Sequence, residues 1–324
     1  MKSFVHINAL TIEEAVSNLR RYGDKANAIA GGTDLLGKMK DMIVPGYPEA
    51  VINLKTIPGL DFIKEEGGVL KIGALTRLRD IATDSSIRGT FSALAEAAHR
   101  TASPQLREMG TIGGNICQDI RCWYYRSPNI RFPCLRKGGG RCYAIDGDNR
   151  YHSIFGGSVE EGCYAVHPSD TAPALIALNA KIKTSMRTIK AEDFFHVDVN
   201  KTTVLENDEL VTEIHVPTPA DDTKSAFNKF AIRRSIDFPI VNCAAMITSS
   251  GERVTAARVC LNAVYVTPYR AIKAEEALVG KAIHEETAEE AGAAAVSDAK
   301  PLSHNGYMVQ IAKTLVQRTI LACK

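Results

Sequence analysis

The sequence predicts an α+β protein of about two domains, and three observations support this prediction. The chain has 324 residues, of which 45% are hydrophobic, so it can build sizeable cores. Strand-like and helix-like segments alternate over roughly the first 100 residues, which is typical of α/β architecture. Further strand-like segments follow residue 225, and helix-like segments come after them.

The first helix is predicted by its start signal and its apolar spacing. Thr11 and Glu14 form a Thr-x-x-Glu capping box, and Gly23 is a natural stop. Between them, apolar residues recur at i, i+3, i+4 and i+7 on one helical face. The other elements expected here are strands in NAIAGGTDLL, AVINL and GVLKIGAL, and helices in TRLRDIATD and FSALAEAAHRTA.

Regular patterns return from DTAPALIALNAKIKT onward. Strands are expected in AFNKFAIRR, IVNCAAMIT and VTAARVCLNAV, and helices in AEEALVG and TAEEAGAAAV. A last helix is expected from Tyr307 to Ile320.

The composition argues against several classes of protein. A formal net charge of +2 gives no indication of a nucleic-acid or membrane-surface partner. No run of 18 apolar residues predicts a transmembrane helix, and MKSFVHINALTIEE lacks the apolar region of a signal peptide. We therefore expect a cytoplasmic protein whose thiols stay reduced, which makes disulfides a poor explanation for its cysteines.

The segment from Cys117 to Cys163 has no clean period, yet it contains five of the 8 cysteines. Such a long irregular stretch usually has a function. Iron–sulfur and zinc sites both use four thiolates, and separately buried thiols are the third possibility. Cys117 directly follows a regular segment, so we expect it to be a packed thiol.

Two glycine motifs indicate places where a ligand can approach the backbone. GGTDLLGKM matches the spacing of a phosphate-binding P-loop, but Met39 stands where a hydroxyl is needed. A turn at Gly31 and Gly32, where amides approach a pyrophosphate, is the better functional interpretation. A second pair of glycines precedes Asn115, whose amide could contact a ring or phosphate. Each motif alone is more often structural, and no G-x-G-x-x-G occurs.

Four motifs in order identify a family resemblance that covers nearly the whole chain. They are AGGTDLL at 30–36, ASPQLREMGTIGGNICQD at 102–119, HPSDTAPAL at 167–175 and KFAIRRSIDFPIVNCAA at 229–245. Together they resemble the FAD-binding medium subunit of the xanthine dehydrogenase, or molybdenum hydroxylase, family. The resemblance implies an FAD domain of the vanillyl-alcohol-oxidase (PCMH) type with two subdomains. A C-terminal domain like that of the CO dehydrogenase flavoprotein follows it.

The resemblance also implies a set of FAD-binding residues. The first motif is expected to wrap the pyrophosphate, the second to contact the flavin and Asp170 to bind its sugar-alcohol portion. Phe238 is expected near the isoalloxazine, and Thr101 along the cofactor. In full, the expected set is Ala28, Ile29, Ala30, Gly31, Gly32, Thr33, Asp34, Leu35, Thr101, Thr111, Ile112, Gly113, Gly114, Asn115, Asp170 and Phe238.

About 40 residues more than most medium subunits have separate GGN from SD. This departure resembles the 4-hydroxybenzoyl-CoA reductase β subunit and the FAD subunit of bacterial aldehyde oxidoreductases, in which the insertion holds a [4Fe–4S] cluster. The implied ligands are Cys122, Cys134, Cys142 and Cys163. Zinc stays the sharper rival to this cluster, although paired C-x₂₋₄-C knuckles are absent among these four.

The resemblance implies a division of the chain into three segments. They are an FAD-binding domain at 1–177 with the insertion at about 117–163, a C-terminal flavoprotein domain at 178–285 and a helical tail at 286–324.

The predicted function is electron transfer within a molybdenum hydroxylase-type oxidoreductase. No molybdopterin motif and no C-x₄-C-x₂-C spacing occurs, so the implied partners are a large molybdopterin-binding subunit and a small [2Fe–2S] subunit. We assign no catalytic residue. The basic side chains of the insertion (Arg121, Arg126, Arg131, Arg136, Lys137 and Arg141) are either a solvated surface or a group that offsets cluster charge or docks a ferredoxin-like carrier. A self-sufficient FAD oxidase with a zinc or empty loop is the alternative, and a binding module without redox role is a third.

Overall fold

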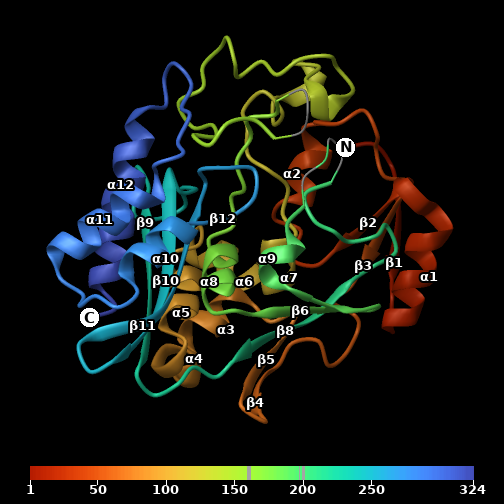
Figure 1. Cartoon of the computed structure of the whole chain (residues 1–324). Helices are drawn as coiled ribbons and strands as arrows, with labels where there is room; N and C mark the ends of the chain where they lie inside the picture. The colour runs from red at the N-terminus through yellow and green to blue at the C-terminus, as the bar shows by residue number, and fades with distance from the viewer. Residues whose placement is uncertain (159–161, 197, 199–200) are drawn as a thin grey trace.

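The computed structural model describes residues 1–158, 162–196, 198 and 201–324. Helices and strands are mixed along the chain, which confirms the α+β class. Within these residues the strands form three sheets, with helices packed against them (Figure 1).

The N-terminal sheet is parallel, in the order β1-β3-β2. Its strands are β1 (Val5–Asn8), β2 (Ala26–Ile29) and β3 (Ala50–Asn53). Helix α1 (Ile12–Tyr22) packs Ala15 and Leu19 against this sheet. The predicted N-cap is present, because Thr11 accepts the backbone N–H of Glu14. The reciprocal bond of the predicted capping box is not formed, because the Glu14 carboxylate accepts the N–H of Leu10 and not that of Thr11.

The middle sheet has five antiparallel strands in the order β4-β5-β8-β6-β7. Their bounds are β4 (Ile63–Glu66), β5 (Val69–Gly73), β6 (Lys181–Thr184), β7 (Thr188–Lys190) and β8 (Val211–Pro217). The largest buried cluster contains apolar side chains from this sheet and from the helices beside it. Those helices are α3 (Leu78–Thr83), α4 (Ser85–Thr90), α5 (Ser92–His99), α7 (Ile112–Ile116), α8 (Thr171–Ala177) and α9 (Ala191–Phe194).

The C-terminal sheet is antiparallel, in the order β12-β11-β10-β9. Strand β10, one of its two inner strands, is buried on both faces. Cys243 and Ala245 face α12 and its neighbours, while Ala244 faces α5 and α8. This explains the nearly continuous apolar run that predicted the strand. The bounds are β9 (Thr223–Phe230), β10 (Val241–Ser250), β11 (Arg253–Asn262), β12 (Tyr269–Arg270), α10 (Ile272–Leu278), α11 (Glu285–Ala295) and α12 (Tyr307–Leu321).

The insertion after α7 packs as a small core of its own. Its buried centre contains Ile120, Tyr125 and Leu135, together with Ile43 from the N-terminal part and Val266 from the C-terminal part. The short turns η2 (Pro128–Ile130) and η3 (Leu135–Lys137) are its helical elements. In Figure 1 this yellow-green segment lies at the top, opposite the β4–β5 hairpin. Among the described residues, no helix is long and apolar enough to cross a membrane.

Candidate functional site

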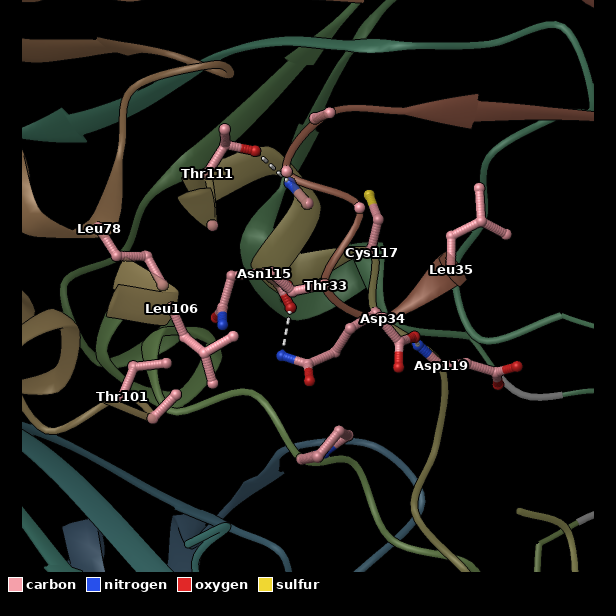
Figure 2. A pocket seen from close by; sticks show the side chains of 18 of the residues that line it. Thr33, Asp34, Leu35, Leu78, Thr101, Leu106, Thr111, Asn115, Cys117 and Asp119 are labelled. Atoms are coloured by element: carbon pink, nitrogen blue, oxygen red, sulfur yellow. Dashed lines mark hydrogen bonds between the residues drawn. The ribbon is translucent and has the colours of Figure 1, made fainter. Parts of the chain in front are cut away.

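A cavity of about 270 Å³ lies where the two glycine motifs meet (Figure 2). Fourteen of the sixteen predicted FAD-binding residues line it: Ala28, Ile29, Ala30, Gly31, Gly32, Thr33, Asp34, Leu35, Thr101, Thr111, Gly114, Asn115, Asp170 and Phe238. Gly113 lines a neighbouring cavity instead, and Ile112 is fully buried in the core. The tertiary structure therefore brings together residues from widely separated parts of the chain.

The first wall is the turn between β2 and α2 (Leu35–Lys40). A Cβ on Gly31 would lie 2.2 Å from the carbonyl oxygen of Met109, so packing between the two motifs already requires glycine there. Gly32 has φ +72°, which favours glycine as well. In the described chain, the backbone N–H groups of Gly31, Gly32 and Thr33 donate no hydrogen bond. Three successive free N–H groups on a cavity wall can bind an anion such as a pyrophosphate.

The second wall is α7, which Thr111 caps by accepting the N–H of Gly114 at 3.1 Å. Asn115 follows on the same short helix. Its Oδ1 atom accepts the hydroxyls of Ser169, at 2.5 Å, and Thr171, at 2.7 Å. These bonds orient the amide and leave its NH₂ group without a partner in the described chain. Asn115 can therefore donate into the cavity, as Figure 2 lets the reader follow.

The floor of the cavity contains a buried ion pair. Lys229 donates to Asp170 at 2.7 Å, and both side chains are only 3% exposed. Asn242 donates to the same carboxylate at 2.7 Å. Burial raises the pKa of Asp170, and Lys229 and Asn242 oppose this shift. Asp170 therefore lines the cavity, while its carboxylate is held by Lys229 and Asn242.

Several lining residues escaped the sequence-based prediction. Gln118, Asp119 and Arg121 come from the chain that leaves α7, and Lys38 comes from α2. The second glycine motif could have predicted the first three, because they directly follow the end of its short helix and line the same cavity. Ile236 gave no sequence signal, since its φ of +68° is unusual for a β-branched residue.

A second, mostly apolar cavity of about 170 Å³ shares a wall with the first. Ala28, Ala30, Thr111, Gly114 and Cys117 line both. The two cavities therefore offer a compartment of mixed polarity and a mostly apolar one, which suits a long ligand with both kinds of surface.

The four predicted metal ligands line one further cavity, inside the insertion. Cys122, Cys134, Cys142 and Cys163 surround a small space of about 10 Å³. No three His, Cys, Asp or Glu side chains of the described residues converge closely enough to surround a single metal ion. All eight cysteines of the chain are free thiols, and the other four lie outside this group.

Comparison with known proteins accounts for nearly the whole chain in two parts. Residues 2–219 match the family described as FAD binding domain in molybdopterin dehydrogenase, and residues 225–323 match the CO dehydrogenase flavoprotein C-terminal domain. The chain belongs to the FAD-binding medium subunits of the molybdenum hydroxylase family. It is accordingly an oxidoreductase subunit that binds FAD.

Relatives resemble this medium subunit over nearly its whole length. The aldehyde oxidoreductase FAD-binding subunit PaoB of Escherichia coli is 34% identical, covering 97% of this chain and 96% of its own. The carbon monoxide dehydrogenase medium chain of Hydrogenophaga pseudoflava is 29% identical, covering 96% and 94%. A solved structure of the enzyme from H. pseudoflava matches with a TM-score of 0.78 at 29% identity, covering 99% of this chain and 97% of that one.

The basic residues of the medium subunit's insertion are mostly not a solvated surface. Arg126 and Arg121 pair with Asp34, and the Arg121 guanidinium stacks 4.0 Å from the centre of the Phe238 ring. Arg136 and Lys137 are buried within the insertion. The expectation of a solvated basic face is therefore wrong for these four, because the insertion folds onto the flavin loop and around its own thiols.

Cys117 differs from the expected packed thiol. It lies at the C-terminal cap of α7, is exposed, and lines both large cavities of the medium subunit. The reason is that the helix ends there, so its last side chain faces the cavity and not the core. It stays separate from the four clustered cysteines, as the sequence indicated.

Proposed function

We propose that this medium subunit carries FAD and a [4Fe–4S] cluster and relays electrons between a molybdenum-containing partner and an external carrier. FAD exchanges electrons in pairs, and a cluster passes them singly. The observation that carries the proposal is that four cysteines spread over 42 positions, from Cys122 to Cys163, line one cavity next to the flavin loop.

The flavin part of the proposal rests on unused donors. The free amides of Gly31, Gly32 and Thr33 would hold the pyrophosphate, and the NH₂ group of Asn115 would donate to the cofactor. Phe238 is 48% exposed, although it is a large apolar side chain that lines the cavity. Covering it with a planar ring would remove this exposed apolar surface from water.

The cluster part rests on a charge imbalance. Arg136 is 8% and Lys137 is 5% exposed, and neither forms an ion pair with any described carboxylate. The Arg136 Nε atom lies 3.4 Å from Cys163 Sγ, and its Nη2 atom has no partner. Burial raises the pKa of Cys122 to about 12, so this thiol is neutral when free and does not balance these cations. Thiolates that ligate a metal centre would supply the missing negative charge.

The spacing of the four cysteines favours a cluster over zinc, because paired C-x₂₋₄-C knuckles are absent among them. A zinc ion needs four sulfurs at about 2.3 Å, which requires the thiols to converge on one point. The four thiols line a common space of about 10 Å³, so either centre requires them to move. A cubane distributes its four ligands over four irons. We expect the thiol side chains to turn outward when it binds, because the present space is small.

The proposed assembly follows from the relatives' names. Several are named as medium chains or subunits of dehydrogenases, and another is the nicotine 6-hydroxylase medium subunit of Paenarthrobacter nicotinovorans. We propose a large molybdopterin-binding subunit and a small [2Fe–2S] subunit as partners, and a ferredoxin-like carrier. A cytoplasmic location is part of the proposal, supported by eight free thiols. The segment boundaries at 177 and 285 also stay proposals, which limited proteolysis would test.

The proposal is tested on protein purified without oxygen. We expect flavin and iron–sulfur absorption together, with about four irons and no zinc per chain. One zinc per chain would favour the alternative oxidase with a structural zinc loop, and a colourless protein without iron or flavin would overturn the proposal.

A single substitution separates the two cofactors. Cys134→Ser removes one of the four thiolates, so iron should be lost while FAD remains bound at saturating concentration. Cys323→Ser, a buried cysteine near the C-terminus, is the matched control and should keep both. Iron and flavin analysis of the two variants checks this, and loss of FAD alone from Cys134→Ser would contradict the ligand assignment.

A further inference from the structure

Asp34 is the point at which the flavin turn and the cysteine insertion meet. It directly follows Gly31–Thr33, the turn that lines the cavity and whose backbone N–H groups donate no hydrogen bond in the described chain. Its carboxylate accepts the backbone N–H of Asp119 at 2.9 Å and the guanidinium of Arg121 at 3.1 Å. Arg126 binds both carboxylate oxygens, at 2.7 and 3.3 Å. Asp119 is the last residue of the second glycine motif, and Arg121 and Arg126 lie beyond it in the insertion.

Asp34 does not perform the role that its position suggests. It occupies the N-cap of α2, where an aspartate usually accepts a backbone N–H of the helix. Here its side chain makes no capping hydrogen bond. Burial alone would raise the pKa of Asp34, but Arg126 and Arg121 lower it below its ordinary value. The carboxylate is therefore ionised, and it accepts hydrogen bonds from Arg121 and Arg126 and not from its own helix.

Arg126 connects this contact to the cysteines. Its backbone N–H donates to the carbonyl of Cys122 at 2.8 Å, so one turn of chain carries both the first thiol and the guanidinium. The guanidinium also donates to the carbonyls of Asp119, at 2.9 Å, and Ile120, at 3.0 Å. Four hydrogen bonds at separate positions hold the side chain in one orientation.

A second contact runs parallel to the first. The Tyr125 hydroxyl donates to Asp119 at 2.5 Å, and Lys38 of α2 pairs with the same carboxylate. The ring of Tyr125 lines the thiol cavity. Tyr125 and Arg126, which follow Cys122 in the same turn, thus connect the thiol cavity to the ends of the two glycine motifs.

We propose that Arg126 is a positioning residue that couples the two cofactor sites of this chain, an inference that rests on the proposed function. When the thiol cavity is filled, the Cys122 turn is held in place and Arg126 holds Asp34 and the flavin turn. When FAD is bound, the same contacts order the insertion. Because coupling between two binding equilibria is reciprocal, each cofactor strengthens the binding of the other by the same factor.

The coupling is measured as a ratio of FAD dissociation constants. Iron-loaded wild type should bind FAD at least ~5-fold more tightly than Cys134→Ser, the lower end of usual coupling factors. In the Arg126→Gln background this ratio should fall to about 1, because the connection is cut. Arg126→Lys should restore part of the ratio, since an ammonium keeps the charge but not the bidentate geometry. FAD titrations of the four combinations give the ratio directly.

The matched control is Arg131→Gln in the same insertion. Arg131 is exposed and contacts the Phe132 ring, with no ion pair among the described residues. Its ratio should equal that of wild type. If Arg126→Gln folds poorly, Asp34→Asn combined with Arg126→Gln removes both charges and should fold while the ratio stays near 1. An unchanged ratio in Arg126→Gln, or an equal loss in Arg131→Gln, would overturn the inference.

A second measurement separates this inference from the proposed function. Hydrogen exchange of residues 119–137 is followed in iron-free protein with and without FAD. FAD should protect these amides in wild type and not in Arg126→Gln. A protein that never binds iron but shows this difference would refute the cluster and retain the coupling. No protection by FAD in wild type would refute the coupling.

Discussion

The glycines in and after the flavin turn differ in what the fold itself requires of them, whether or not a cofactor is bound. Gly31 faces the carbonyl of Met109, and this contact joins the two glycine motifs before a ligand enters. Gly37, five positions after Gly32, has no atom within 4 Å of the place where a Cβ would lie. The two glycines of one motif therefore have different reasons to be glycine.

This difference predicts opposite effects of the same substitution. Gly31→Ala should destabilise the chain by about 1–3 kcal/mol, the usual cost of overpacking, and weaken FAD binding. Gly37→Ala should stabilise α2 by up to ~1 kcal/mol and leave FAD binding unchanged. Denaturant unfolding and FAD titration of both variants check this, and equal effects of the two would show that the Met109 contact is unimportant.

A buried histidine predicts a pH dependence of stability. His167 is fully buried with its Nε2 atom unpartnered, and burial lowers its pKa to about 3. Between pH 6.5 and 3, His167 binds a proton in the unfolded chain but stays neutral in the folded chain. The free energy of unfolding should therefore fall by up to ~1.4 kcal/mol per pH unit as the pH drops from 6.5 toward 3. His167→Gln should flatten this dependence in denaturant titrations at several pH values; an identical slope would contradict the assignment.

At the scale of elements, the insertion is held together by turns and not by regular secondary structure. After η3, Gly138 adopts φ +81° and the N–H of Gly139 donates to the carbonyl of Cys134. A Cβ on Gly139 would lie 1.7 Å from the carbonyl oxygen of Pro133, whereas Gly140 has open space. The triple glycine thus contains one residue that the fold around Cys134 requires and one that it does not.

The insertion should respond accordingly to two adjacent substitutions. Gly139→Ala forces apart the backbone around Cys134, at a cost of about 1–3 kcal/mol, and should lower the iron content. Gly140→Ala should keep the iron content of wild type. Iron analysis with thermal unfolding of both variants is the test, and full iron retention in Gly139→Ala would exclude a role for this turn in holding the cluster.

At the scale of the whole molecule, ion pairs connect the two family-matched parts. Glu192 belongs to the first part, and it accepts Arg258 at 2.8 Å and Arg270 at 3.0 Å from the second. Arg258 also donates to the carbonyl of Ile176 at 3.0 Å. These contacts join β11 and β12 to the end of α8 and to α9.

This bridge predicts how the two parts unfold. Glu192→Gln should lower the free energy of unfolding by about 1 kcal/mol, because the pairs are partly exposed. It should also broaden or split the denaturant transition. Glu290→Gln, which breaks an exposed pair with Lys281, should do neither. Matching transitions in the two variants would show that the bridge does not join the parts.

The sequence predicted most elements and most of the flavin cavity, because both depend on local signals. The N-cap at Thr11, the apolar run of β10 and the ordered glycine motifs are readable within a few residues. The predictions that the structure corrects concern which side chains are buried and which groups they pair with. Arg126 looked solvated because its partner Asp34 is 92 positions away. Cys117 looked packed because the direction of a side chain at a helix end depends on what docks there.

The sequence by itself determined the fold class, the family, the cysteines set apart from the rest and the two glycine motifs. Each is encoded in residue type and spacing, through backbone freedom, hydrophobic period and ligand chemistry. Only the tertiary structure decided which cavity each residue faces, which charges are buried and which are paired. Those properties arise when distant segments exclude water between them, and a cation's environment is then set by whichever carboxylate or thiol the fold places beside it.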